Sequence, residues 1–186
     1  MKKWLVAILL LCAIPDSVLA EGGAVSAADP RAAEAGREIL RQGGSAADAA
    51  IAMMLALSVV EPQSSGIGGG GFMIHNDGRT NDIGTIDGRE TAPSSASPRL
   101  FLDAAGKPMP FIDAFAGGRS VGVPGNIALA ARASARWGKL RWSALFQPAI
   151  RLAENGYQVT PRLAEALSRL KAIWPDFPAA QAIYWQ

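Results

Sequence analysis

The chain has 186 residues, of which 49% are hydrophobic and 18% are charged, and its formal net charge at pH 7 is +2. A net charge this small gives no overall attraction to nucleic acid. The length suits one domain that can bury a core of its own.

The first twenty residues have the pattern of a secretory signal peptide. Two lysines precede an apolar run over residues 4–14, and Val18-Leu19-Ala20 offers small residues at the cleavage positions. The run is shorter than the roughly 20 residues that span a bilayer, so we expect no stable membrane anchor. We predict that residues 1–20 are removed and that the mature protein is periplasmic or secreted.

The signal peptide also contains the single cysteine of the chain. Bulky Leu11 stands immediately before Cys12, which argues against processing as a lipoprotein. Cleavage after Ala20 would remove Cys12, so residues 21–186 can form no disulfide and must be held together by their core.

Two helices are predicted before the first strand. Asp29 followed at once by a proline is typical of a helix N-terminus, and Gly43-Gly44 would end this helix. A second helix begins at Ser45, whose spacing to Asp48 resembles a capping box, and it ends before Pro62. It is apolar on every face but only about 16 residues long, so we expect the buried central helix of the domain.

A glycine-rich turn over residues 64–71 leads into a predicted β-hairpin. Five of the six residues from Gly66 to Gly71 are glycine. Glycine is retained where the backbone takes positive φ or where another group approaches closely, so the turn indicates a site or a very tight core. Residues 72–75 are expected to form one strand, 76–78 the turn and 83–87 the returning strand.

The rest of the chain is predicted to be irregular and then helical. Prolines at positions 93, 98, 108 and 110 allow no long element. Three further helices are expected over residues 124–137, 142–154 and 161–173. The predicted fold class is α+β, with helices covering an antiparallel sheet of which only a hairpin can be identified.

Basic residues are frequent in the predicted helices of the C-terminal part. Nine lie between Arg119 and Lys171, against only Glu154 and Glu165. They are scattered at helical spacing among apolar residues, without the interleaved aromatic residues of a single-strand binder. This indicates a solvated helix face or a surface that contacts more protein, and we expect no nucleic-acid partner.

Two short motifs match known patterns but lie in the wrong context. Residues 66–71 satisfy a dinucleotide-binding pattern, yet that pattern needs a strand before it and a helix after it, and the predicted order is reversed. Residues 118–122 satisfy the nucleophile-elbow pattern, but such an esterase needs a later histidine and His75 comes earlier. One histidine and no mature cysteine leave only carboxylates, so we expect no metal and no cofactor.

Arg89 is the residue most suited to binding a ligand. It stands where the predicted sheet ends, and a planar guanidinium there suits bidentate capture of a carboxylate. Asp87 and Glu90 offer an alternative, because an internal ion pair with either would occupy the guanidinium. Nothing in the sequence fixes the separation of these two carboxylates or raises a pKa for acid–base work.

Four segments in order resemble the start of the large subunit of gamma-glutamyltransferases, a family also called gamma-glutamyltranspeptidases or glutathione hydrolases. They are residues 43–50, 60–72, 87–93 and 120–125. The resemblance covers nearly all of residues 21–186. Four ordered motifs are far more specific than either single pattern above.

The resemblance implies an N-terminal-nucleophile (Ntn) hydrolase with a four-layer αββα sandwich, made as one precursor that cleaves itself into a large and a small subunit. The N-terminal threonine of the small subunit would attack the γ-glutamyl amide of glutathione, with its own α-amine as the base. The glutamyl group would pass to water or to an amino-acid or peptide acceptor. Arg89 matches the arginine that grips the α-carboxylate of the γ-glutamyl group.

No threonine of this chain matches the expected nucleophile. Thr80, Thr85, Thr91 and Thr160 lie in contexts unlike the family's cleavage site. We therefore assign no catalytic residue, and we expect residues 21–186 to be the N-terminal portion of the large subunit, a fragment that is inactive alone. Two alternatives stay open: a glutaryl or cephalosporin acylase of the same superfamily, and a non-catalytic truncated remnant with exposed apolar faces.

Overall fold

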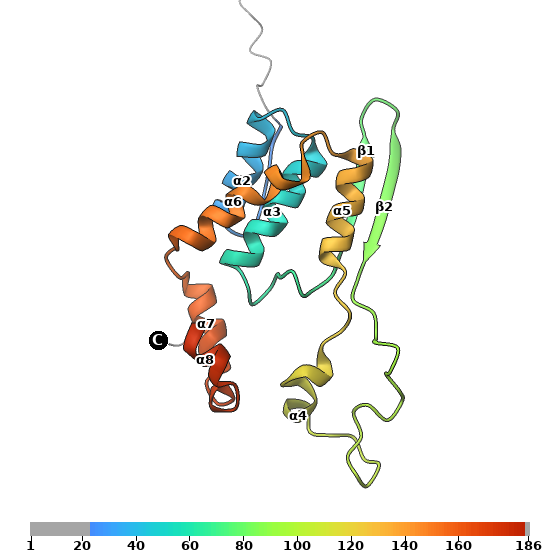
Figure 1. Ribbon diagram of the computed structural model, residues 1–186, viewed down its shortest axis with the longest axis vertical. Coiled ribbons are helices and arrows are strands. Elements are labelled where there is room, and N and C mark those ends of the chain that lie inside the picture. Colours follow the sequence, from blue (N-terminus) through green and yellow to red (C-terminus); the bar gives the residue numbers. More distant parts are fainter. Residues whose placement is uncertain (1–22, 185–186) are drawn as a thin grey trace, which may run out of the picture.

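The computed structural model describes residues 23–184 (Figure 1), so the predicted signal peptide over residues 1–20 lies outside the described range. In chain order the elements are α2 (Pro30–Arg41), α3 (Ala46–Val60), β1 (Gly71–Asp77), β2 (Asp82–Gly88), α4 (Phe111–Phe115), the 3₁₀ turn η1 (Gly118–Ser120), α5 (Asn126–Trp137), α6 (Trp142–Asn155), α7 (Pro161–Arg169), η2 (Trp174–Asp176) and α8 (Pro178–Tyr184). Within residues 23–184, no helix is both long enough and apolar enough to cross a membrane.

The first two helices begin as the sequence predicts. Asp29 caps α2 by accepting the backbone N–H of Arg31 at 2.8 Å. Ser45 and Asp48 form a reciprocal capping box at α3, because each side chain accepts the backbone N–H of the other residue. Both helix starts are therefore fixed by contacts within three residues.

Helix α3 is the central helix of the domain, as predicted. It packs against α2, α5 and α6, and Figure 1 shows it between α2 and α5. Ile51 and Leu55 of α3 are buried with Leu129 of α5 and Leu145 of α6 in one apolar cluster. Because three helices cover it, α3 needs almost no polar face.

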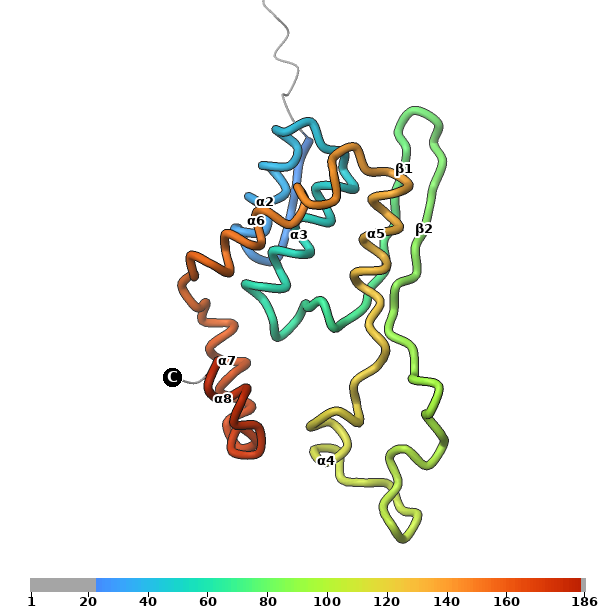
Figure 2. The backbone as a smooth tube through the Cα atoms, in the orientation of Figure 1, coloured from blue at the N-terminus to red at the C-terminus, as the bar shows by residue number. Residues whose placement is uncertain are grey.

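The hairpin forms a two-stranded antiparallel sheet that lies beside α5 (Figure 2). Its register runs from Gly71 opposite Gly88 to Asp77 opposite Asp82. Met73 and Ile86 point to the helical side and join the core. On the other face, exposed apolar side chains are Phe72 (66%), Ile74 (75%) and Ile83 (71%). The described residues thus give the α+β arrangement that was predicted, with helices on one face of an antiparallel sheet.

The hairpin turn lies later than the sequence predicts. We expected it over residues 76–78, but β1 continues to Asp77 and the connection is formed by residues 78–81. Asp77 Oδ1 accepts the backbone N–H of Arg79 at 3.0 Å, and Asn81 takes the left-handed conformation with φ 63°. Asn tolerates positive φ, so Asn81 rather than Gly78 reverses the chain.

Two predicted helix boundaries are also corrected. Helix α5 begins at Asn126 and not at residue 124, because Val123 is paired with Thr91 in an extended bridge. Helix α7 ends at Arg169 and not at residue 173, because the chain tightens into shorter turns there and Trp174 Nε1 donates to the carbonyl oxygen of Leu167. Helices α4 and α8 were not predicted.

Candidate functional site

The glycine turn begins where α3 ends, and Glu61 anchors its first residues. Glu61 follows α3 directly and is 3% exposed. Its carboxylate accepts a hydrogen bond from Gln63 Nε2 at 2.9 Å and lies 3.4 Å from Arg162 Nε of α7. Its carbonyl oxygen accepts the backbone N–H groups of Ser64 and Ser65. These contacts fix the direction in which the chain leaves α3.

Tyr157 fastens the loop before α7 to the end of α3. Its hydroxyl donates to the carbonyl oxygen of Val59, in the last turn of α3, at 2.6 Å. Burial raises the pKa of the Tyr157 hydroxyl. The guanidinium of Arg31 lies over the tyrosine ring, 4.7 Å from its centre. The α6–α7 loop is thus held by both the end of α3 and the start of α2.

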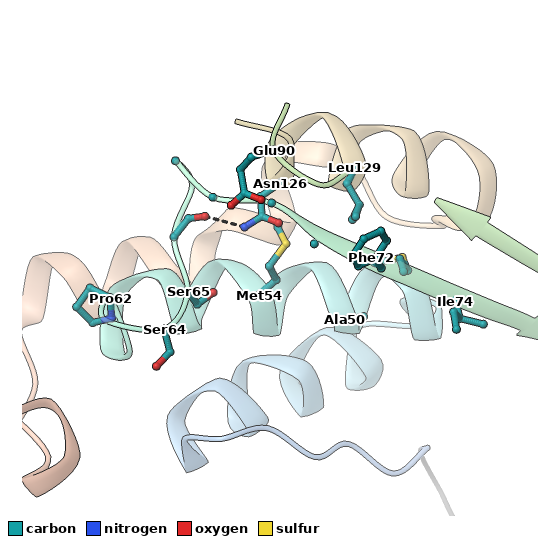
Figure 3. A pocket seen from close by; sticks show the side chains of 16 residues that line it. Ala50, Met54, Pro62, Ser64, Ser65, Phe72, Ile74, Glu90, Asn126 and Leu129 are labelled. Carbon is teal, nitrogen blue, oxygen red and sulfur yellow. Dashed lines mark hydrogen bonds between the residues drawn. The ribbon is translucent and has the colours of Figure 1, made fainter. Parts of the chain in front are cut away.

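Asn126, the first residue of α5, holds the middle of the glycine turn. Its Nδ2 donates to the carbonyl oxygen of Gly66 at 2.7 Å, the hydrogen bond drawn in Figure 3. The backbone N–H groups of Gly125 and Asn126 both donate to the carbonyl oxygen of Gly69 at 3.0 Å. Asn126 is buried, so these bonds are shielded from water. The turn is therefore a fixed part of the fold.

Close approach, and not an unusual backbone angle, explains the glycine at position 70 of the turn. None of residues 66–71 has a positive φ. A Cβ on Gly70 would lie 2.5 Å from the carbonyl oxygen of Gly88 and 2.6 Å from the backbone nitrogen of Glu90. Only glycine lets the turn pass this close to the end of β2.

Arg89 follows β2 and is contacted by both neighbouring acidic residues. Asp87 Oδ1 accepts the backbone N–H of Arg89 at 2.9 Å, and Glu90 Oε2 lies 3.2 Å from Arg89 Nε. The internal ion pair is thus made with Glu90. The Arg89 side chain is 68% exposed. Within residues 23–184, its two terminal nitrogens donate no hydrogen bond. They are free to donate to a carboxylate, so the role of Arg89 as a carboxylate ligand stays a prediction.

Two neighbouring cavities share Gly68 and Glu90. One has a volume of about 720 Å³ and is lined by the glycine turn and apolar side chains such as Phe72 (Figure 3). The other has a volume of about 500 Å³ and is lined by Arg89 and Arg119. Both volumes lie in the range of small-molecule sites. The carboxylate that pairs with Arg89 therefore also faces the glycine turn.

His75 and Ser120, the serine of the nucleophile-elbow pattern over residues 118–122, both make structural contacts. His75 stacks on Trp137 of α5, with ring centres 4.5 Å apart and planes 7° apart. Ser120 Oγ donates to the carbonyl oxygens of Phe115 at 2.6 Å and Gly117 at 3.2 Å, which fastens the η1 turn. Within residues 23–184, no group of three or more histidine, cysteine, aspartate or glutamate side chains is placed to hold a metal ion.

The comparisons with known proteins agree with this arrangement. Residues 32–186 match the model of the family described as Gamma-glutamyltranspeptidase. The chain is 47% identical to the glutathione hydrolase proenzyme of Bacillus subtilis (strain 168) over 146 residues, which are 78% of this chain and 25% of the relative. The crystal structure of Helicobacter pylori gamma-glutamyltranspeptidase superposes with a TM-score of 0.83 and 35% identity, covering 88% of this chain and 46% of that one. That of cephalosporin acylase from Bacillus halodurans superposes with a TM-score of 0.62 and 34% identity, covering 80% and 26%.

Helices on one face of an antiparallel sheet thus match the fold of gamma-glutamyltranspeptidase-type Ntn hydrolases. The chain belongs to the gamma-glutamyltranspeptidase family. It spans about a quarter of the length of the curated relatives it matches.

Proposed function

We propose that residues 21–186 form the N-terminal part of the large subunit of an exported gamma-glutamyltransferase. The complete enzyme would cleave the γ-glutamyl amide of glutathione and related compounds and pass the glutamyl group to water or to an amino-acid or peptide acceptor. The observation that carries the proposal is the likeness over residues 32–186 to proteins named glutathione hydrolase and gamma-glutamyltranspeptidase.

In this proposal Arg89 binds the α-carboxylate of the γ-glutamyl group. Support comes from its exposed terminal nitrogens at the wall of a cavity and from Glu90, which orients the guanidinium through Nε. A planar fork held at one nitrogen keeps two parallel donors for a carboxylate. The glycine turn would form the floor of the same pocket.

The nucleophile would come from the part of the precursor that this chain does not span. The small subunit, released from the same precursor, is the proposed partner, and its N-terminal threonine would complete the site. Phe72, Ile74 and Ile83 support this partner, because their outward face needs an apolar cover. We expect the chain alone to have no activity.

We also propose that the protein is exported to the periplasm or beyond. The support is the sequence of residues 1–20, with its two lysines, apolar run and small residues at the cleavage positions. N-terminal sequencing of the protein from cell fractions tests this. We expect a mature N-terminus at Glu21 in the exported fraction, and an intact Met1 in the cytoplasm would contradict export.

The catalytic proposal is tested with the complete precursor protein that contains this chain. The purified product is assayed for release of a chromogenic amine from a γ-glutamyl anilide, and mass spectrometry reports whether a subunit begins with threonine. We expect both autocleavage and amine release. A correctly cleaved product that releases no amine would overturn the proposal.

An acylase for glutaryl side chains is the second candidate, favoured by the likeness to the cephalosporin acylase. A glutaryl group differs from a γ-glutamyl group by lacking the α-amine, and both present a carboxylate to Arg89. The ratio of kcat/KM for γ-glutamyl anilide to that for glutaryl anilide separates the two. A ratio below one would favour the acylase.

A further inference from the structure

The cavity that contains Arg89 holds a second arginine, Arg119. From this we infer that Arg119 binds a second carboxylate, carried by the leaving group of the substrate. The preferred substrates would then be γ-glutamyl peptides with a free C-terminus, and not γ-glutamyl amides of neutral amines. This inference rests on the proposed function and adds a specificity-determining residue to it.

The fold brings the two arginines to one cavity although they are thirty positions apart in the sequence. Thr91 and Val123 pair in an antiparallel bridge, with Val123 N donating to the carbonyl oxygen of Thr91 at 2.8 Å and Thr91 N to that of Val123 at 3.4 Å. The bridge closes the irregular excursion over residues 92–122, which is seen below the sheet in Figure 2. Thr91 follows Arg89 closely in the chain, and Val123 follows Arg119. Both side chains line the same cavity of about 500 Å³, a size that suits a short peptide.

Arg119 is held in place without being neutralised. Its Nη1 lies against Met109 Sδ and 3.4 Å from the carbonyl oxygen of Leu100. The turn that carries it is fastened by Ser120. No carboxylate pairs with Arg119 within residues 23–184, whereas Arg89 has Glu90. Arg119 therefore keeps two further nitrogens, Nε and Nη2, for a ligand.

The charge of the cavity fits such a substrate. Two arginines and one glutamate line it, which gives a local charge of +1. A γ-glutamyl peptide carries two carboxylates and one ammonium group, a net charge of −1. If Arg89 takes the α-carboxylate, the unpaired arginine is the group left to receive the carboxylate at the other end.

The test compares glutathione with its C-terminal amide, two substrates that differ only in the second carboxylate. The complete enzyme and its Arg119→Gln and Arg119→Lys variants are assayed, with Arg99→Gln as the matched control. Arg99 is an exposed arginine of the same excursion that does not line the cavity. The measured quantity is kcat/KM for the acid divided by kcat/KM for the amide.

We expect the wild type to prefer the acid and Arg119→Gln to lower that ratio about 10- to 100-fold, the range for a lost hydrogen bond to a charged group. Arg119→Lys should keep part of the preference, and Arg99→Gln should keep all of it. If Arg119 only fastens the loop, Arg119→Gln lowers kcat/KM equally for both substrates. The ratio then stays constant, which overturns the inference.

Failure of this inference differs from failure of the proposed function. A wild type that cleaves γ-glutamyl anilide but shows no preference for the acid overturns the role of Arg119 alone. A correctly cleaved wild type that acts on none of these compounds overturns both.

Discussion

The carboxylate of Asp48 accepts the backbone N–H of Lys139 at 2.8 Å, although the two residues are 91 positions apart. The same oxygen accepts the backbone N–H groups of Ser45 at 2.9 Å and Leu140 at 3.2 Å. Asp48 is fully buried. One side chain thus joins the start of the central helix to the α5–α6 loop, and so links the two halves of the helical layer.

Replacing this carboxylate should destabilise the domain strongly. We expect Asp48→Ala to lower the free energy of unfolding by about 3 kcal/mol or more, because three backbone donors lose their acceptor in a buried place. Ser45→Ala removes only the local cap and should cost about 1 kcal/mol. Urea unfolding followed by circular dichroism measures both, and equal losses would show that the contact to Lys139 is unimportant.

Asp29 makes stability depend on pH. Hydrogen bonding from the Arg31 side chain is the main cause that lowers the pKa of Asp29 in the folded chain, and burial opposes it. Because the folded pKa lies below the unfolded value of about 3.9, the stabilisation is present above about pH 4 and is lost as the pH falls through the folded pKa.

The free energy of unfolding should therefore decrease below about pH 4, and Asp29→Asn should make that decrease shallower while lowering stability at pH 7. Hydrogen bonds from Arg79 lower the pKa of Asp77 as well, so the Asp29→Asn variant keeps part of the decrease. Urea titrations at several pH values supply the comparison. Parallel profiles for the wild type and the variant would contradict the role of Asp29.

Sequence reasoning succeeds here where structure is determined locally. The caps at Asp29 and Ser45 act within three residues, and both helices begin where these caps predict. The glycine turn and Arg89 also stand out in the sequence. The hairpin turn was misplaced because Asn81 and Gly78 both favour a reversal, and cross-strand register decides between them.

The contacts that build the site could not be predicted, because they join distant segments. Asn126 binds the glycine turn across 60 positions, and Arg162 reaches Glu61 from α7. In the sequence, the surroundings of Asn126 and Arg162 look like those of any ordinary helix start. The reason for glycine at position 70 is the backbone of Gly88 and Glu90, which only the folded chain brings close.

Two glycines of the turn should respond differently to the same substitution. Gly70→Ala places a Cβ against backbone atoms that cannot move aside, so we expect a loss of about 1–3 kcal/mol in stability. At Gly68 a Cβ meets nothing within 4 Å and φ is not positive, so Gly68→Ala should change stability by less than about 0.5 kcal/mol. Urea unfolding of the two variants tests this, and equal effects would contradict the close-approach explanation.

The apolar outer face of the sheet should make the isolated chain self-associate. We expect Ile74→Thr combined with Ile83→Thr to raise the monomer fraction at a fixed concentration with little loss of stability, because both side chains are already exposed. Met73→Thr, on the inner face, should instead lower stability without reducing association. Sedimentation velocity gives the monomer fraction, and a wild-type chain that is fully monomeric would count against an uncovered interface.

Arg89 can be tested in the complete enzyme against a second exposed arginine, Arg79. Arg89→Ala should lower kcat/KM for γ-glutamyl anilide, mainly by raising KM, because the α-carboxylate loses a charged bidentate partner. The ratio of wild-type to variant kcat/KM should correspond to about 1.5–3 kcal/mol of lost binding free energy. Arg89→Lys should recover part of the loss, since lysine supplies the charge without the planar fork. Arg79→Ala removes another exposed arginine, which lies at the hairpin tip and is paired with Asp77, and should leave both constants unchanged. If KM and kcat/KM of Arg89→Ala equal those of the wild type, the guanidinium is committed to Glu90 and another group must bind the carboxylate.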